Sequence, residues 1–76
     1  MSRPLHQIAR DIRQHWPNMY FGAVPYVDAM AELDTINDKY YADDARSVVL
    51  YALSNMATFR GLDARRIKAE LKEMLK

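Results

Sequence analysis

Apolar residues recur along the chain at the three- and four-residue spacing of amphipathic helices. The first such set is Leu5, Ile8, Ala9, Ile12 and Trp16. It predicts a helix over about residues 3–16, with Ser2 as the N-cap candidate and Pro17 ending it, because proline disfavours helical geometry in the residue before it. The same spacing predicts a second helix over about residues 24–33.

The pattern returns twice in the second half of the chain. It predicts a helix over about residues 43–59, capped by Asp43 or Asp44. Apolar residues lie on several sides of this segment, so we expect it at the centre of the fold. A last helix is predicted over about residues 63–75, and its inward stripe consists of Ala64, Ile67, Leu71, Met74 and Leu75.

A short turn at residues 60–63 separates the last two predicted helices. Gly61 can adopt the positive φ angle common after a helix, and Asp63 suits the N-cap of the next one. Leu62 is expected to pack on Ile67 as a hydrophobic staple. No segment alternates as a strand would, so the sequence predicts an all-α fold: a compact bundle of four helices, one domain over residues 1–76, ending in a helical hairpin.

Composition narrows the class of protein. Half of the 76 residues are apolar, 28% are charged and none is cysteine. These proportions favour a folded domain that packing alone, or packing with self-association, must stabilise. No apolar stretch approaches the roughly 20 residues of a membrane span, and the first residues lack the apolar core of a signal peptide. The sequence therefore predicts a cytoplasmic protein with no membrane partner.

The net charge is only +1, but it is unevenly distributed. Basic residues prevail near both ends, and the middle is acidic. Between residues 21 and 45, Lys39 is opposed by Asp28, Glu32, Asp34, Asp38, Asp43 and Asp44. Such segregation either balances within the fold or leaves one positive face suited to an acidic partner.

The last two predicted helices could form a helix-turn-helix that reads DNA. Gly61 at the turn, Ala57 before it and Ile67 after it fit that motif, whereas Arg60 and Glu70 stand where it usually has apolar residues. Possible nucleic-acid contacts are Arg60, Arg65, Arg66, Lys68 and Lys72. The alternative is that these are solvated helix residues, and a net charge of +1 is low for a dedicated DNA-binding domain.

Catalytic and metal-binding patterns are not found in the sequence. His6 and His15 are nine residues apart and cannot share a metal at i, i+4 spacing. The acidic segment from Asp34 lacks the glycine and closing glutamate of a calcium loop. With two glycines in the chain, neither a phosphate-binding loop nor a nucleophile elbow is present. We therefore expect no enzyme activity and no cofactor.

Aromatic residues gather around the two predicted connectors. They either seal the end of the bundle or remain exposed as anchors for a partner. Tyr40 and Tyr41 are the preferred exposed pair, because neighbours just before a helix cap cannot both point inward. Tyr20 is the third possible partner contact.

Several strings of the chain resemble small proteins encoded by actinobacterial phages and related prophages. These strings are Tyr20-Phe21-Gly22-Ala23-Val24-Pro25-Tyr26, Ala45-Arg46-Ser47, Thr58-Phe59-Arg60-Gly61 and Ala64-Arg65-Arg66-Ile67-Lys68-Ala69-Glu70-Leu71. The resemblance would cover nearly the whole chain. It implies a phage or mobile-element protein inside a bacterial host, and it carries over neither an activity nor a functional residue.

Three hypotheses of function follow. The leading one is a non-enzymatic interaction protein that binds a host or phage protein through aromatic and charged surface. The second is a small DNA-binding regulator with residues 63–75 as its recognition helix. The third is a self-associating structural protein whose apolar face forms a homodimer, which is reasonable because a core this small is marginal.

Overall fold

The computed structural model describes residues 3–76. In chain order its elements are α1 (Leu5–His15), α2 (Val24–Met30), β1 (Lys39–Tyr40), β2 (Asp43–Asp44), α3 (Ala45–Ser54) and α4 (Leu62–Met74). The mostly helical fold and the four helices within residues 3–76 agree with the sequence pattern. The small antiparallel sheet was not predicted, and the suggested cap at Ser2 lies outside the described residues.

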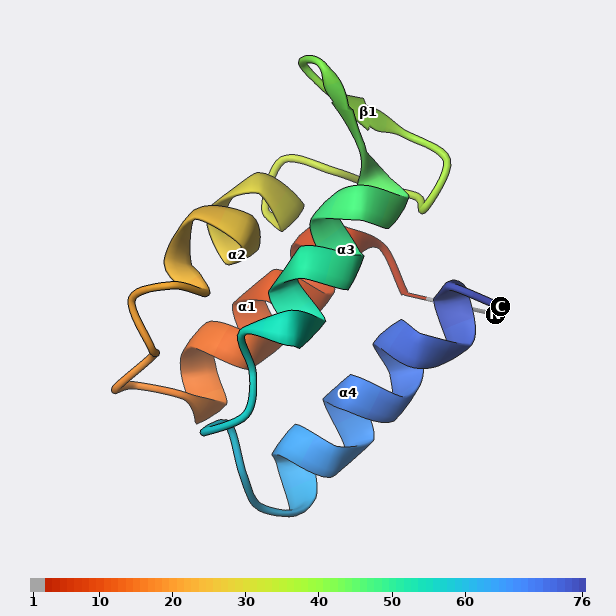
Figure 1. Cartoon of the computed structure of the whole chain (residues 1–76). Helices are drawn as coiled ribbons and strands as arrows, with labels where there is room; N and C mark the ends of the chain where they lie inside the picture. Colours follow the sequence, from red (N-terminus) through yellow and green to blue (C-terminus); the bar gives the residue numbers. More distant parts are fainter. Residues whose placement is uncertain (1–2) are drawn as a thin grey trace.

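The helices are arranged around α1, which packs against both α2 and α4 (Figure 1). α3 packs mainly against α2 and contacts α4 much less. The hairpin of β1 and β2 extends beyond the helices (Figure 1). Arg3, at the start of the described residues, lies against Glu70 of α4. The radius of gyration is 11.0 Å, close to the ~11 Å expected of a compact chain this long.

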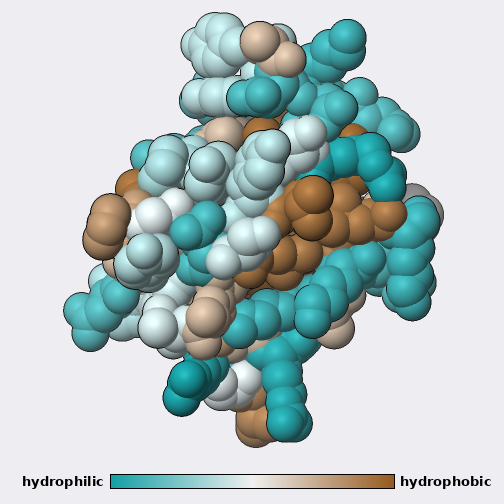
Figure 2. Space-filling view, in the orientation of Figure 1, coloured by the Kyte–Doolittle hydropathy of each residue, from teal (hydrophilic) through white to brown (hydrophobic). Residues whose placement is uncertain are grey.

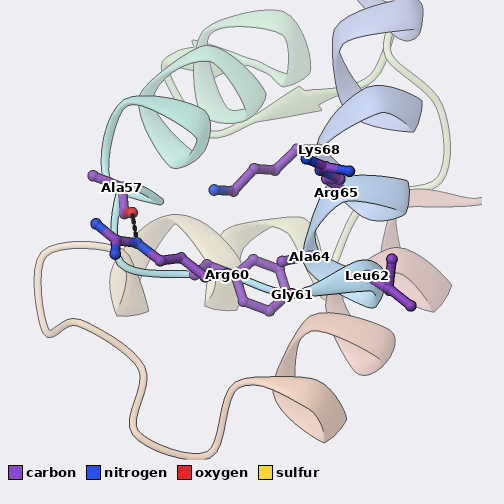
Figure 3. A pocket seen from close by; sticks show the side chains of 8 residues that line it. Ala57, Arg60, Gly61, Leu62, Ala64, Arg65 and Lys68 are labelled. Atoms are coloured by element: carbon purple, nitrogen blue, oxygen red, sulfur yellow. Dashed lines mark hydrogen bonds between the residues drawn. The ribbon is translucent and has the colours of Figure 1, made fainter.

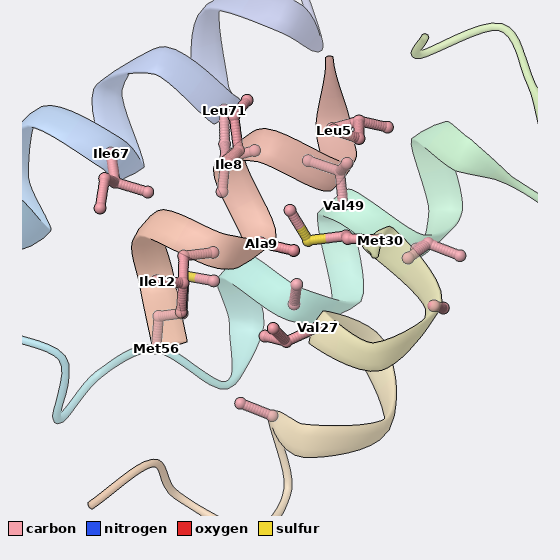
Figure 4. Close-up of a cluster of buried hydrophobic side chains, with 14 of the residues drawn as sticks. Leu5, Ile8, Ala9, Ile12, Val27, Met30, Val49, Met56, Ile67 and Leu71 are labelled. Carbon is pink, nitrogen blue, oxygen red and sulfur yellow. The ribbon is translucent and has the colours of Figure 1, made fainter. Parts of the chain in front are cut away.

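The core is drawn from all four helices and from three connectors (Figure 4). Each helix contributes inward apolar residues at helical spacing, among them Ile8, Val27, Val49 and Ile67. The largest fully buried side chains of the core are Phe59, Leu5, Ile8, Ile12, Met30, Met56, Ile67, Leu71, Val27 and Val49. The ring of Phe59 stacks on Trp16 with centroids 4.8 Å apart, so the connector before α4 is anchored on the end of α1.

α3 is shorter than predicted at both ends. Asp44 is its N-cap and accepts a hydrogen bond from the Ser47 N–H at 2.8 Å, whereas Asp43 belongs to β2. The helix ends at Ser54 because the Asn55 side-chain amide donates to the Tyr51 carbonyl at 2.8 Å. That carbonyl would otherwise accept the Asn55 main-chain N–H in a continuing helix. The prediction that residues 43–59 form one helix is therefore wrong.

α4 begins one residue before the predicted start. Gly61 is its N-cap with φ 113°, a conformation open essentially only to glycine. Asp63 lies in the first turn and does not cap the helix, although its charge is favourable there. Leu62 is 84% exposed, so the predicted staple to Ile67 is wrong. The turn expected at residues 60–63 is the longer connector over residues 55–61.

The hairpin pairs Lys39 with Asp44 and Tyr40 with Asp43. Two-residue strands are too short to show the alternation that marks a strand in sequence. Tyr41 makes the turn with φ 56°, a left-handed conformation that non-glycine residues adopt uncommonly. Residues 39–44 thus form a small antiparallel hairpin, although the sequence pattern predicted a helix from residue 43.

Candidate functional site: the face between α3 and α4

α4 presents three lines of residues, each at helical spacing. Ala64, Ile67 and Leu71 are buried. A second line, here called the α1 flank, consists of Asp63, Arg66, Glu70 and Glu73. The third line borders α3 and is called the basic stripe; it consists of Arg65, Lys68 and Lys72. Their i, i+3, i+7 spacing aligns these cations on one side of the helix.

Ion pairs neutralise most of the charge on the α1 flank. Arg66 lies 3.0 Å from Asp11 and 3.2 Å from Asp63. Glu70 accepts two hydrogen bonds from the Arg3 guanidinium, at 2.7 and 3.0 Å. Glu70, which departs from the DNA-reader pattern, is therefore half-buried in a fork of hydrogen bonds.

Asp11 is the centre of this network. Besides Arg66, its carboxylate lies 3.0 Å from an Arg3 nitrogen and 2.9 Å from His15 Nδ1, and only 13% of its side chain is exposed. The hydrogen bond from Arg66, followed by the one from Arg3, lowers the pKa of Asp11. The hydrogen bond from Arg3 likewise lowers the pKa of Glu70. The α1 flank therefore stabilises the packing of α4 on α1.

The basic stripe has no such partners. Among the ion pairs formed within residues 3–76, none includes Arg60, Arg65, Lys68 or Lys72. Partial burial and then the charges of Lys72 and Arg60 lower the pKa of Lys68. Its ammonium lies 5.9 Å from the centre of the Phe59 ring. A cation held near an aromatic ring and other cations, with no carboxylate, is ready to bind an anion.

A hollow of about 550 Å³ opens beside Lys68, between the connector and α4. Its lining residues are Ala57, Phe59, Arg60, Gly61, Leu62, Ala64, Arg65 and Lys68. Figure 3 shows Lys68 reaching from α4 across the hollow toward the end of α3, and Arg60 on the opposite side. The hollow therefore combines an apolar floor with three cations.

Apolar side chains continue this face toward the other end of α3. Leu50, which is 53% exposed, and Leu75 line a second hollow of about 380 Å³. Leu53, three residues after Leu50, is half-buried. Leu50, Leu53 and Leu75 are called the apolar strip below, and Figure 2 shows an apolar surface over the space between α3 and α4. The prediction that this helix is central implied that other elements enclose it. α3 instead has one apolar side exposed to solvent.

The residues predicted as nucleic-acid contacts divide between the two flanks. Arg60, Arg65 and Lys68 line the hollow on the α3 side, and the charge of Lys72 acts on Lys68. Arg66 is held by carboxylates on the α1 side. Ala57, expected inside a helix, is exposed in the connector. The apolar strip was missed as a site, although the apolar residues on several sides of α3 could have signalled it.

The tyrosines predicted as partner contacts do not form one surface. Tyr41 is 86% exposed at the tip of the hairpin, as expected. Tyr40 is half-buried, and its hydroxyl donates to Glu32 at 3.3 Å, so the prediction of an exposed pair is only half right. Tyr20 is 44% exposed and lies against Gly22, where an added Cβ would stand 2.6 Å from its ring.

The described part of the chain has neither a membrane-spanning helix nor a metal-binding cluster. No helix within residues 3–76 is long and apolar enough to cross a membrane. No group of three His, Cys, Asp or Glu residues in the same range is arranged to hold a metal ion. The α3–α4 face is therefore the candidate site.

Comparison with protein-family models, curated proteins and solved structures finds no match.

Proposed function

We propose that this protein is a small non-enzymatic interaction protein, of phage or mobile-element origin, that binds a protein partner across the α3–α4 face. The single observation behind this proposal is the contrast within α4: cations facing α1 are paired, and those bordering α3 are not. Toward the other end of the same face lies Leu50, the exposed leucine of the apolar strip. Apolar centres bordered by charge are typical of protein interfaces.

A tagged pull-down from host extract after nuclease treatment tests this proposal. The wild-type bait is expected to retain a defined protein, and Leu50→Ser and the double variant Lys68→Gln/Lys72→Gln are each expected to lose most of it. Glu73→Gln is the matched control, because it removes one exposed charge from the α1 flank. Tyr41→Ser tests the aromatic tip of the hairpin as the alternative contact.

The outcomes separate the alternatives. Loss with Tyr41→Ser and retention with both face variants would place the contact on the hairpin and contradict the proposed face. Recovery that depends on intact nucleic acid would contradict a protein partner. Concentration-dependent growth of the purified protein's hydrodynamic size, abolished by Leu50→Ser, would instead support the self-associating structural protein.

Binding to DNA is the second candidate, and the unpaired Arg60, Arg65, Lys68 and Lys72 are the observation that favours it. DNA contact through these cations should weaken steeply as salt is added, because bound counterions are released from the phosphates. Arg65→Gln should then reduce duplex binding, while Leu50→Ser should leave it unchanged. Absence of a mobility shift at low salt would exclude this candidate.

A further inference from the structure

The α3–α4 face is about as long as a short helix that could lie along it. α3 has 10 residues and α4 has 13, which makes them about 15 and 20 Å long. The two hollows lie at opposite ends of the face: one contains Leu50 and Leu75, and the other contains Phe59, Arg65 and Lys68. A segment that contacts both ends must span most of this length.

We infer that the partner segment is an amphipathic α-helix of about 10–14 residues with acidic residues along one flank. This inference rests on the protein-binding function proposed above, since it names what that face binds. Apolar residues of the segment, spaced at i, i+3 or i+4, and i+7, lie on the apolar strip. Its acidic flank lies along the basic stripe.

Charge complementarity supports the acidic flank. Burial and the neighbouring cations already lower the pKa of Lys68, so the charged ammonium is held at a cost in the free protein. A carboxylate beside it relieves the repulsion from Lys72 and Arg60. The apolar segment also removes water from the rim, which strengthens each new ion pair.

Two observations support a helical partner segment: the spacing of the basic stripe, and the lack of a sheet edge on which the partner could bind as a strand. Arg65, Lys68 and Lys72 are aligned at i, i+3 and i+7, the same spacing at which a facing helix presents its acidic residues. A partner that binds as an added strand needs a free sheet edge. Within residues 3–76 the only sheet is the hairpin of two-residue strands, which is too short to bind one.

Selection from a library of random 16-residue peptides, with the purified full chain as bait, tests the inference. We expect the enriched peptides to share helically spaced apolar residues and two or more acidic residues on one flank. A chosen peptide should gain helicity on binding, seen by circular dichroism. Replacing its acidic residues by glutamine should weaken binding about fivefold to tenfold, as should Lys68→Gln/Lys72→Gln in the protein.

The matched control is Glu73→Gln, which should bind the chosen peptide as tightly as the wild type. Enriched peptides that are basic, extended or without an acidic flank would overturn the inference, and so would no enrichment above an unrelated bait. Equal affinity of the wild type and Lys68→Gln/Lys72→Gln would also overturn it. If the pull-down still depends on Leu50 in any of these cases, the proposed function stands and only the helical acidic partner is wrong.

Discussion

Both flanks of α4 carry charged residues, of both signs on the α1 flank and only cations on the basic stripe, and their surroundings differ. On the α1 flank, Arg66 and Glu70 are bound by Asp11 and Arg3, residues more than 50 positions away in sequence. On the other flank, Lys68 has an aromatic ring and two cations near it. The difference teaches that charge on one helix can hold the fold together on one side and remain available for binding on the other.

The largest expected effect concerns the floor beneath the basic stripe. Phe59 is 1% exposed and stacks on Trp16, so Phe59→Ala should lower the free energy of unfolding by about 3–5 kcal/mol. Urea unfolding followed by circular dichroism measures this change. A loss below about 1 kcal/mol would show that packing does not support the α3 side.

Next in size is removal of the centre of the α1 flank. Asp11→Asn deprives Arg3 and Arg66 of a partner whose side chain is mostly buried, so it should cost about 1–2 kcal/mol of stability. Glu73→Gln, which loses only an exposed pair with Lys76, is the control and should change little. Equal stability of Asp11→Asn and the wild type would contradict the claim that ion pairs on the α1 flank stabilise the fold.

A smaller effect is expected on the basic stripe. Lys68→Gln removes a charge that no carboxylate balances, so the free energy of unfolding should change by less than about 0.5 kcal/mol, in the stabilising direction. Thermal unfolding of Lys68→Gln and Asp11→Asn, measured side by side with the wild type, compares the two effects directly. Destabilisation by more than about 1 kcal/mol would mean that Lys68 has a structural role like that of Arg66.

The charges on the two flanks should affect stability with opposite signs and over different pH ranges. Asp11 and Glu70 have folded-state pKa values below their ordinary 3.8 and 4.5. Their stabilising contribution is therefore complete above those values and is lost as pH falls through the lower folded-state pKa values. Acid unfolding below about pH 4 should be shallower in Asp11→Asn than in the wild type.

Lys68 has a folded-state pKa below its ordinary 10.5. Its charge opposes folding at neutral pH, and that opposition is relieved as pH rises through the lowered value. The stability advantage of Lys68→Gln over the wild type should therefore shrink between pH 7 and about pH 10. An advantage that is constant over this range would contradict an unbalanced charge at Lys68.

Helical spacing was enough to predict the four helices and the buried residues Ala64, Ile67 and Leu71, because these depend on local periodicity. Met74 and Leu75, predicted to point inward as well, are only half-buried. Their ends depend on particular side chains: the Asn55 amide ends α3 early, and Gly61 takes the cap position expected for Asp63. The hairpin was not predicted because its two-residue strands are too short to show the alternation of apolar and polar residues that marks a strand. The fold class was therefore more accessible from the sequence than the boundaries.

The candidate site was predictable only in part. The cations were named from the sequence, but Arg65 and Arg66 are neighbours there, and nothing local distinguishes them. Asp11, 55 residues before Arg66, makes the distinction only once α1 and α4 pack together. The exposure of Leu50 likewise depends on how far α4 lies from α3, which is a property of the tertiary fold.

The central claim is that binding takes place on the α3 side of α4 and not on its α1 flank. A heteronuclear NMR titration of the labelled full chain with an enriched acidic peptide tests it most directly. We expect shifts of the amide signals to concentrate in residues 46–53 and 65–75, with Asp11 and its neighbours in α1 little changed. Shifts concentrated on α1 and the α1 flank, or on the hairpin tip at Tyr41, would contradict the account.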